Sequence, residues 1–174
     1  MVGRFVFATL TCFGAIGAGA LGGCGSDAPQ TPDAALPQDA DFAVCDMTPA
    51  VTYMPGMQVT STSGAYLGTL VSAQTTSTTP PVAVPEVGLG TWVVSVTDAE
   101  AGTPAEVTMT AERPWMPLHG HGATTYPTVS PGDPGQFTVS AMSFFMAGYW
   151  EVKLDLQPAS SPADKLTFAI CIPQ

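Results

Sequence analysis

Glycine and proline interrupt this chain along its whole length: 18 glycines and 17 prolines make up about a fifth of the 174 residues, with no repeat period. Both residues are unfavourable inside helices and common in the turns that separate short strands. Threonine, valine and serine are plentiful, and long runs of Leu, Glu, Lys and Arg at helical spacing are absent. The sequence therefore predicts a turn-rich all-β protein.

The clearest strand pattern is YWEVKLDLQ, residues 149–157, in which apolar and polar residues alternate. Every second residue is apolar and is expected to face the interior: Trp150, Val152, Leu154 and Leu156. The charged residues between them are expected to face solvent: Glu151, Lys153 and Asp155. Such period-2 alternation is typical of a strand with one buried face.

Shorter patterns of the same kind occur elsewhere. Further strands are predicted at residues 41–47, 58–63, 65–75, 91–99, 105–113, 135–144 and 165–172. Residues 75–90 contain too many prolines for a central strand and are expected to form a long loop. About seven short strands in residues 42–174 predict an immunoglobulin-like β-sandwich, although periodicity alone does not give the strand order.

The N-terminus has the pattern of a targeting segment. The basic start MVGR is followed by an apolar stretch, residues 5–20, that is short for a membrane span, and then by LGGC, residues 21–24. This resembles a bacterial lipobox, so residues 1–23 are expected to be a signal peptide and Cys24 to carry lipid. An ordinary signal peptide or an uncleaved anchor are the alternatives. Residues 24–41, with three prolines and no apolar periodicity, are expected to be a flexible linker.

The remaining cysteines and the charges limit the classes of function. Once Cys12 and Cys24 are assigned to the N-terminal segment, Cys45 and Cys171 are left, and an oxidising envelope favours a disulfide between them. Two buried thiols or a copper thiolate site are the alternatives. Fourteen acidic and only three basic residues follow Cys24, which argues against binding to nucleic acid or anionic headgroups.

The two histidines of the chain, His119 and His121, lie one residue apart in a loop rich in glycine and proline. A His-x-His pair places two imidazoles on one side of an extended backbone, within reach of a single ion. The sulfur donors available nearby in the sequence are Met116 and Met146, with Met142 a weaker candidate. Thioethers suit copper better than zinc. A polar loop without metal, with methionines that fill the core, is the alternative.

Residues 90–156 resemble the YtkA-like domain, and the resemblance extends over about the last 85 residues. Two segments carry it: MPLHGHG, residues 116–122, and MAGYWEV, residues 146–152. Ala147 stands where the family pattern leads us to expect proline, a change that removes no ligand. The resemblance implies an immunoglobulin-like sandwich in the bacterial envelope and a copper link through the Met/His loop.

These observations predict a lipid-anchored envelope protein, on the periplasmic or outer-membrane face, that carries or buffers copper. The expected ligands are His119, His121, Met116 and Met146, and a copper-delivery protein is the expected partner. No nucleophile or phosphate-binding motif is present, so we expect no catalysis. The competing hypothesis is a structural or interaction lipoprotein without metal. The two hypotheses differ in the geometry they require. A metal site needs both imidazoles and a methionine sulfur to converge on one point, and a Met146 side chain that points into the core would remove most of the support for copper.

Overall fold

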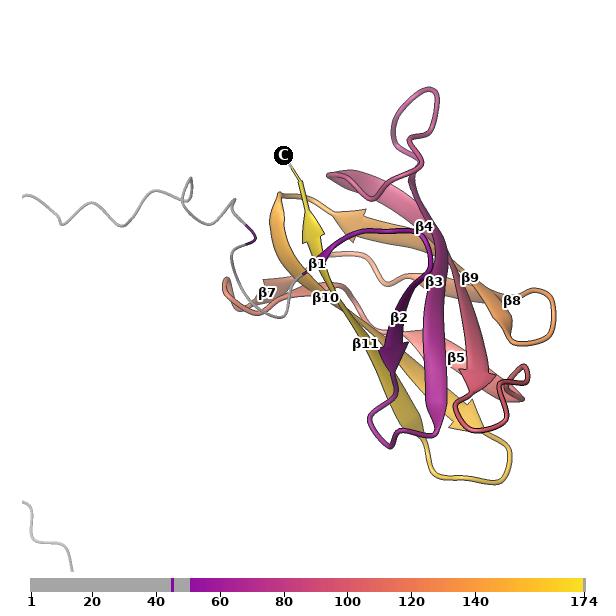
Figure 1. Ribbon diagram of the computed structural model, residues 1–174. Coiled ribbons are helices and arrows are strands. Elements are labelled where there is room, and N and C mark those ends of the chain that lie inside the picture. Colours follow the sequence, from indigo (N-terminus) through magenta and orange to yellow (C-terminus); the bar gives the residue numbers. More distant parts are fainter. Residues whose placement is uncertain (1–44, 46–50, 174) are drawn as a thin grey trace, which may run out of the picture. The chain divides into compact units, whose positions relative to one another are not determined.

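A computed structural model describes Cys45 and residues 51–173 (Figure 1). The expected signal peptide, lipidated Cys24 and linker lie outside these residues, and so does most of the strand predicted at residues 41–47. In the described part every regular element is a strand, and the strands form two sheets. The predicted all-β sandwich is therefore confirmed. Among the described residues there is no helix with the length and apolar character needed to span a membrane.

The first sheet is built around β10 and β11. Its strands are β1 (Val51–Thr52), β11 (Asp164–Ile172), β10 (Gly148–Pro158), β6 (Trp115–Met116), β7 (His121–Gly122) and β5 (Val107–Ala111). They run in the order β1-β11-β10-β6-β7, and β5 also pairs with β10. Along one edge of β10, β5 pairs with the second half of the strand and β6 with Glu151 in the first half. This places the short β6–β7 hairpin beside the beginning of β10.

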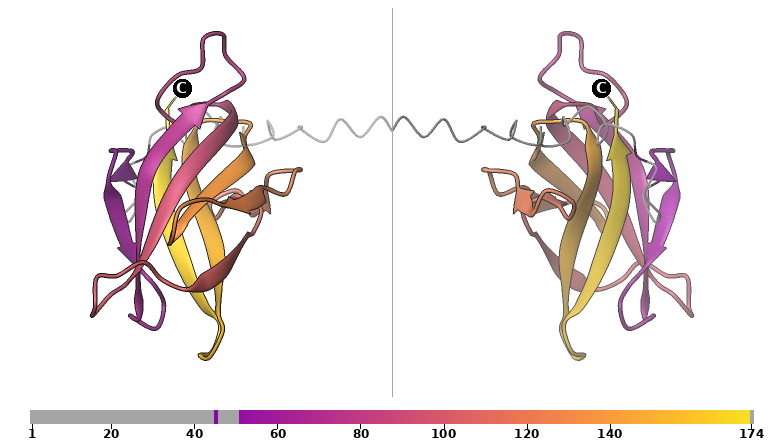
Figure 2. Two further views of the ribbon diagram at one scale, coloured as in Figure 1. Left: turned by 90° about the vertical axis from the view of Figure 1, so that its right-hand side faces the viewer. Right: turned by 90° about the vertical axis from the view of Figure 1, so that its left-hand side faces the viewer.

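The second sheet has the order β2-β3-β4-β9-β8 and is antiparallel throughout. Its strands are β2 (Met57–Thr60), β3 (Tyr66–Thr75), β4 (Gly88–Asp98), β9 (Gln136–Phe144) and β8 (Thr128–Pro131). The two sheets pack face to face (Figure 2). The predicted loop at residues 75–90 is confirmed for residues 76–87, which separate β3 from β4.

The core follows the alternation read from the sequence. On β10 the inward set is fully buried: Trp150, Val152, Leu154 and Leu156. On β4 it is Trp92, Val94 and Val96. The Trp92 ring stacks on Phe144 with ring centroids 5.9 Å apart and meets Phe168 edge-on at 6.1 Å, so it joins the two sheets. On the outer face of β10, Lys153 forms an ion pair with Glu151 (2.9 Å).

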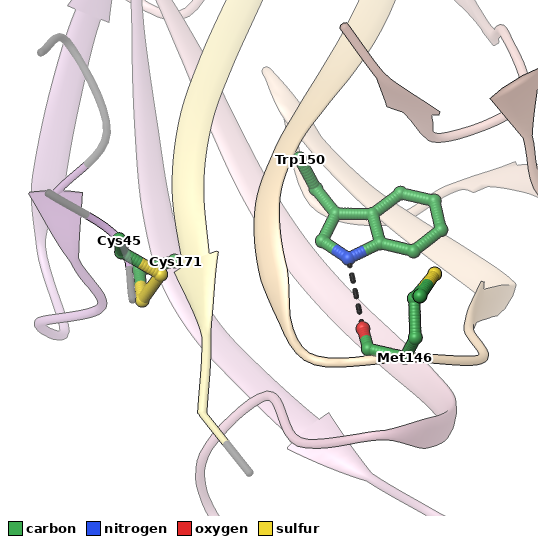
Figure 3. The surroundings of a disulfide bond; sticks show 4 residues. All are labelled: Cys45, Met146, Trp150 and Cys171. Carbon is green, nitrogen blue, oxygen red and sulfur yellow. Dashed lines mark hydrogen bonds between the residues drawn. A yellow bond between two sulfur atoms is a disulfide. The ribbon is translucent and has the colours of Figure 1, made fainter. Parts of the chain in front are cut away.

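The predicted disulfide is confirmed: Cys45 and Cys171 are bonded, with their Cα atoms 5.6 Å apart (Figure 3). It fixes the beginning of the domain to β11, because Cys171 is the penultimate residue of that strand. The two cysteines are 126 residues apart in sequence, so the bond closes a long loop. Such a crosslink stabilises mainly by reducing the entropy of the unfolded chain.

We predict that the Cys45→Ser/Cys171→Ser double variant loses about 5 kcal/mol of unfolding free energy, the chain-entropy value for a loop of this length. Denaturant unfolding of the oxidised protein and the variant would measure the difference. A loss below about 1 kcal/mol would show that the crosslink constrains the unfolded chain little.

Asp164, at the start of β11, fastens the turn between β2 and β3. Its Oδ1 accepts hydrogen bonds from the backbone N–H groups of Ser63 (3.1 Å) and Lys165 (2.8 Å), and its Oδ2 accepts one from the Ser63 hydroxyl. Burial alone would raise the pKa of Asp164, but hydrogen bonds from Ser61, Ser63 and the backbone outweigh it and lower the pKa to about 2. The ionised carboxylate is therefore the form that stabilises this corner.

Because the folded pKa lies below the unfolded value, this contribution is complete above about pH 4 and is lost as the pH falls through about 2. We predict that Asp164→Asn lowers the unfolding free energy by about 2 kcal/mol at pH 7 and by much less at pH 2. Urea unfolding at both pH values measures this. The control is Glu100→Gln, an exposed acid, for which no comparable loss is expected; an equal loss for Asp164→Asn at both pH values would refute the assignment.

Candidate metal centre

The histidine segment folds as a tight hairpin rather than as an open loop. In the β6–β7 pair, Met116 lies opposite His121 and Trp115 opposite Gly122. The backbone N–H groups of His119 (3.2 Å) and Gly120 (3.0 Å) both donate to the Met116 carbonyl, which closes the turn. Gly120 adopts φ of 66°, a conformation in which glycine avoids the strain of a side chain. The turn brings the His119 and His121 rings to a centroid separation of 5.4 Å.

Gly122 allows the hairpin to close against its own first strand. A Cβ atom at this position would lie 2.7 Å from the Pro114 carbonyl oxygen and 3.0 Å from the Trp115 ring. The next backbone N–H, that of Ala123, donates to the same Pro114 carbonyl (2.9 Å). The Trp115 ring thus lies over Gly122 on one side of the hairpin, and Met116 and His121 project from the other side, as cross-strand partners do.

Met116 and His121 differ in how they are buried. The Met116 side chain is 1% exposed and belongs to the hydrophobic core. His121 is partly buried, but its Nδ1 atom is completely shielded and has no hydrogen-bond partner in the described part of the chain. A buried nitrogen left without a partner costs about 1–3 kcal/mol. A bound water molecule or a bound ion would satisfy such an atom.

The turn between β9 and β10, which carries Met146, reaches the hairpin through an aromatic contact. The Phe145 ring lies 5.4 Å from the His121 ring and meets the Trp150 indole edge-on at 5.3 Å. The Trp150 Nε1–H group donates to the Met146 carbonyl (3.1 Å), which fixes the turn (Figure 3). The Met146 side chain lies beside the indole and packs against the core. Phe145, for which no role was predicted, is therefore the residue of this turn that lies against His121.

The structure thus brings some of the predicted residues together and keeps others apart. His119, His121 and Met116 share one hairpin, and Met146 follows the residue that lies against it. Met142 is fully buried on β9 opposite Gly90, within the core. Within the described residues no three His, Cys, Asp or Glu side chains are grouped as a metal site would require. The Met146 side chain packs against the core, which is the arrangement expected of a methionine that is not a ligand.

The spacing of the imidazoles fits one shared ion. With metal–nitrogen bonds of about 2.0 Å and near-tetrahedral angles, two ligating rings have centroids about 5 Å apart. The observed separation is 5.4 Å, with the planes tilted by 39°. Residues 114–132 contain no Asp, Glu, Lys or Arg, but the Arg113 guanidinium donates to the Ala123 carbonyl (3.4 Å), two residues after His121.

The nearest acid on β10 is already engaged on the outer face. Glu151 lies opposite Trp115, accepts a hydrogen bond from the Tyr149 hydroxyl (2.9 Å) and pairs with Lys153. Burial, followed by the hydrogen bond to Glu151 and its charge, raises the pKa of Tyr149 to about 12. Glu151 therefore serves an outer network with Tyr149 and Lys153.

Comparisons with family models, with curated proteins and with solved structures found no match to this chain. The resemblance to the YtkA-like domain therefore remains a prediction from residues 116–122 and 146–152. The β-sandwich fold and the hairpin geometry are observed in the structure and do not depend on that resemblance.

We predict that Gly122→Ala opens the hairpin, because its methyl group would collide with the Pro114 carbonyl and the Trp115 ring. The expected cost is about 1–3 kcal/mol of unfolding free energy, with shifted imidazole NMR signals for His119 and His121. Gly132→Ala is the matched control, since a Cβ there meets only ordinary contacts at 3.7 Å and beyond. Equal stability and unchanged imidazole signals in both variants would contradict this packing.

Proposed function

We propose that this chain is a lipid-anchored protein of the bacterial cell envelope that binds copper as a carrier or buffer. The observation that carries the proposal is the shielded Nδ1 atom of His121, which lacks a hydrogen-bond partner in the described residues and lies beside a second imidazole. His119 and His121 would supply nitrogen donors, and Met116, opposite His121, a sulfur donor. Met146 would complete the set by turning from its position beside Trp150.

The donor set favours copper over the other common metals. Calcium and magnesium prefer oxygen ligands, and zinc sites are built from cysteine, histidine and carboxylate. Two imidazoles with thioethers match the ligands that copper accepts, above all in its monovalent state. A blue-copper electron carrier would need a cysteine thiolate, and Cys45 and Cys171 are joined in the disulfide. Storage or transfer of copper to a delivery partner suits such a site better than electron transfer.

The second candidate is a structural or interaction lipoprotein without metal. It is favoured by the packing of Met116, which is fully buried in the core and fills space there as methionines commonly do. In that case Phe145 and Trp150 would hold the hairpin as a fixed surface element, and a water molecule would satisfy His121 Nδ1.

Titration with Cu(I) and Cu(II) in competition with a chelator separates the two candidates. We predict one copper per chain, and loss of binding in the His119→Ala/His121→Ala double variant. Met116→Leu should weaken Cu(I) binding at least about tenfold, since loss of even an outer-shell partner costs 10–100-fold. Met142→Leu is the matched control, because that methionine is buried on β9 opposite Gly90, in the sheet that does not contain the hairpin.

Absence of stoichiometric binding, or binding that survives the double histidine variant unchanged, would overturn the copper proposal. The chain would then be better described by the second candidate.

A further inference from the structure

One end of the sandwich is formed by segments that are distant in sequence. Gly88, the first residue of β4, pairs with Phe144, the last residue of β9. The chain then turns through residues 145–147 and begins β10 at Gly148, which pairs with Ile172, the last residue of β11. Loop 76–87 precedes β4 and therefore projects at the same end (Figure 1). We call these segments, residues 76–89, 144–149 and 170–173, the apolar end.

This end exposes large hydrophobic side chains and carries almost no charge. Four such residues are between 40% and 48% exposed: Val84, Val87, Leu89 and Phe145. In the three segments Glu86 is the only charged residue. Thr76, Ser77 and Thr79 are exposed in the same segments. Exposed apolar side chains with few charges among them are typical of a surface that contacts another molecule or lipid.

The opposite end has the reverse character. There β4 ends, β9 and β11 begin, and the connecting segments are acidic. The acidic residues are Asp98, Glu100, Glu106, Asp133 and Asp164, and the only nearby base, Lys165, is paired with Glu112 and Asp155. The sandwich is therefore polarised along its strands, from an acidic end to an apolar end.

The N-terminal part of the chain joins the domain at the apolar end. Cys171, the partner of Cys45 in the disulfide, pairs with Tyr149, next to the Gly148–Ile172 pair that marks this end. Figure 3 shows the disulfide in the same neighbourhood as Met146 and Trp150 of the β9–β10 turn. The 44 residues before Cys45, which include the apolar stretch 5–20 and Cys24, are thus attached here.

We propose that the apolar end rests on the lipid bilayer to which the chain is anchored, with Leu89 and Phe145 among the side chains that enter it. The inference depends on the membrane anchor of the proposed function and not on copper. An anchor attached at this end holds the apolar side chains at a high effective concentration near lipid, so even a weak contact is occupied. The acidic end then points away from anionic headgroups. No cation lies within the apolar end, so the attraction is hydrophobic and anionic lipid does not strengthen it.

This orientation places the histidine hairpin next to the membrane surface, because Phe145 lies against His121.

The test uses the membrane-isolated protein, with its own N-terminus, in phosphatidylcholine vesicles whose acyl chains carry bromine, a quencher of tryptophan fluorescence. Leu89→Trp is compared with Val71→Trp, which replaces a residue of similar exposure (43% against 46%) within β3. The fluorescence of the unsubstituted protein is subtracted. We expect quenching at Leu89→Trp to exceed that at Val71→Trp at least threefold, with no increase when anionic phosphatidylglycerol is added.

If the protein floats with the vesicles and the two variants are quenched equally, the inference is refuted but the proposed membrane anchor is not. This is also the result if a protein, rather than lipid, covers the apolar end. If the protein does not float with the vesicles, both the proposed membrane anchor and this inference are refuted.

Discussion

The burial of the Trp150 indole is the interaction on which this structure most depends. The ring is fully buried, meets Phe144 edge-on at 5.4 Å and Phe145 at 5.3 Å, and donates its N–H to the Met146 carbonyl. It therefore fixes both sides of the turn by which the chain crosses from β9 to β10, that is, from one sheet to the other. A buried indole whose N–H has a partner combines a large apolar area with a defined orientation. The position of Phe145 against His121 follows from this crossing.

The site consequently depends on core packing as much as on its own turn. The hairpin is closed locally by two hydrogen bonds to the Met116 carbonyl and by the contact of Trp115 with Gly122. Its inner side is set by Met116, which packs in the core, and by Phe145, which Trp150 holds in place. His121, partly buried, lies opposite Met116 and against the Phe145 ring, and its Nδ1 atom is shielded. The sandwich therefore holds the hairpin in place, whereas Met146 would have to turn from its position beside Trp150 to become a ligand.

Much of the fold could be predicted because the long strands bury one face. The alternation in residues 149–157 predicted β10 and its buried residues, since a shift of one residue would expose the whole set. The strand pattern in residues 91–99 likewise predicted β4. The short strands could not be predicted in this way. β6 and β7 have two residues each, too few for any periodicity, and they exist because Gly122 and the Met116 carbonyl close the hairpin. The disulfide followed from the number of cysteines and their positions near the ends of the domain.

The site was predicted only in part, because some of its contacts join segments that are distant in sequence. His119, His121 and Met116 lie close together in sequence, so their proximity could be inferred from the motif. Phe145 and the shielding of His121 Nδ1 result from packing between segments more than twenty residues apart, which the pattern of one sequence does not encode. The consecutive pair Phe144 and Phe145, one buried and one exposed, was the only local sign that the strand alternation ends there.

X-ray absorption spectroscopy of the protein loaded with one equivalent of Cu(I) tests the central claim most directly, because it reports the atoms bound to the metal. We predict imidazole scattering from two histidines together with at least one sulfur neighbour, and loss of the sulfur contribution when Met116 and Met146 are both replaced by leucine. A spectrum with only nitrogen and oxygen neighbours, or one without imidazole scattering, would contradict the assignment of the hairpin as a copper site.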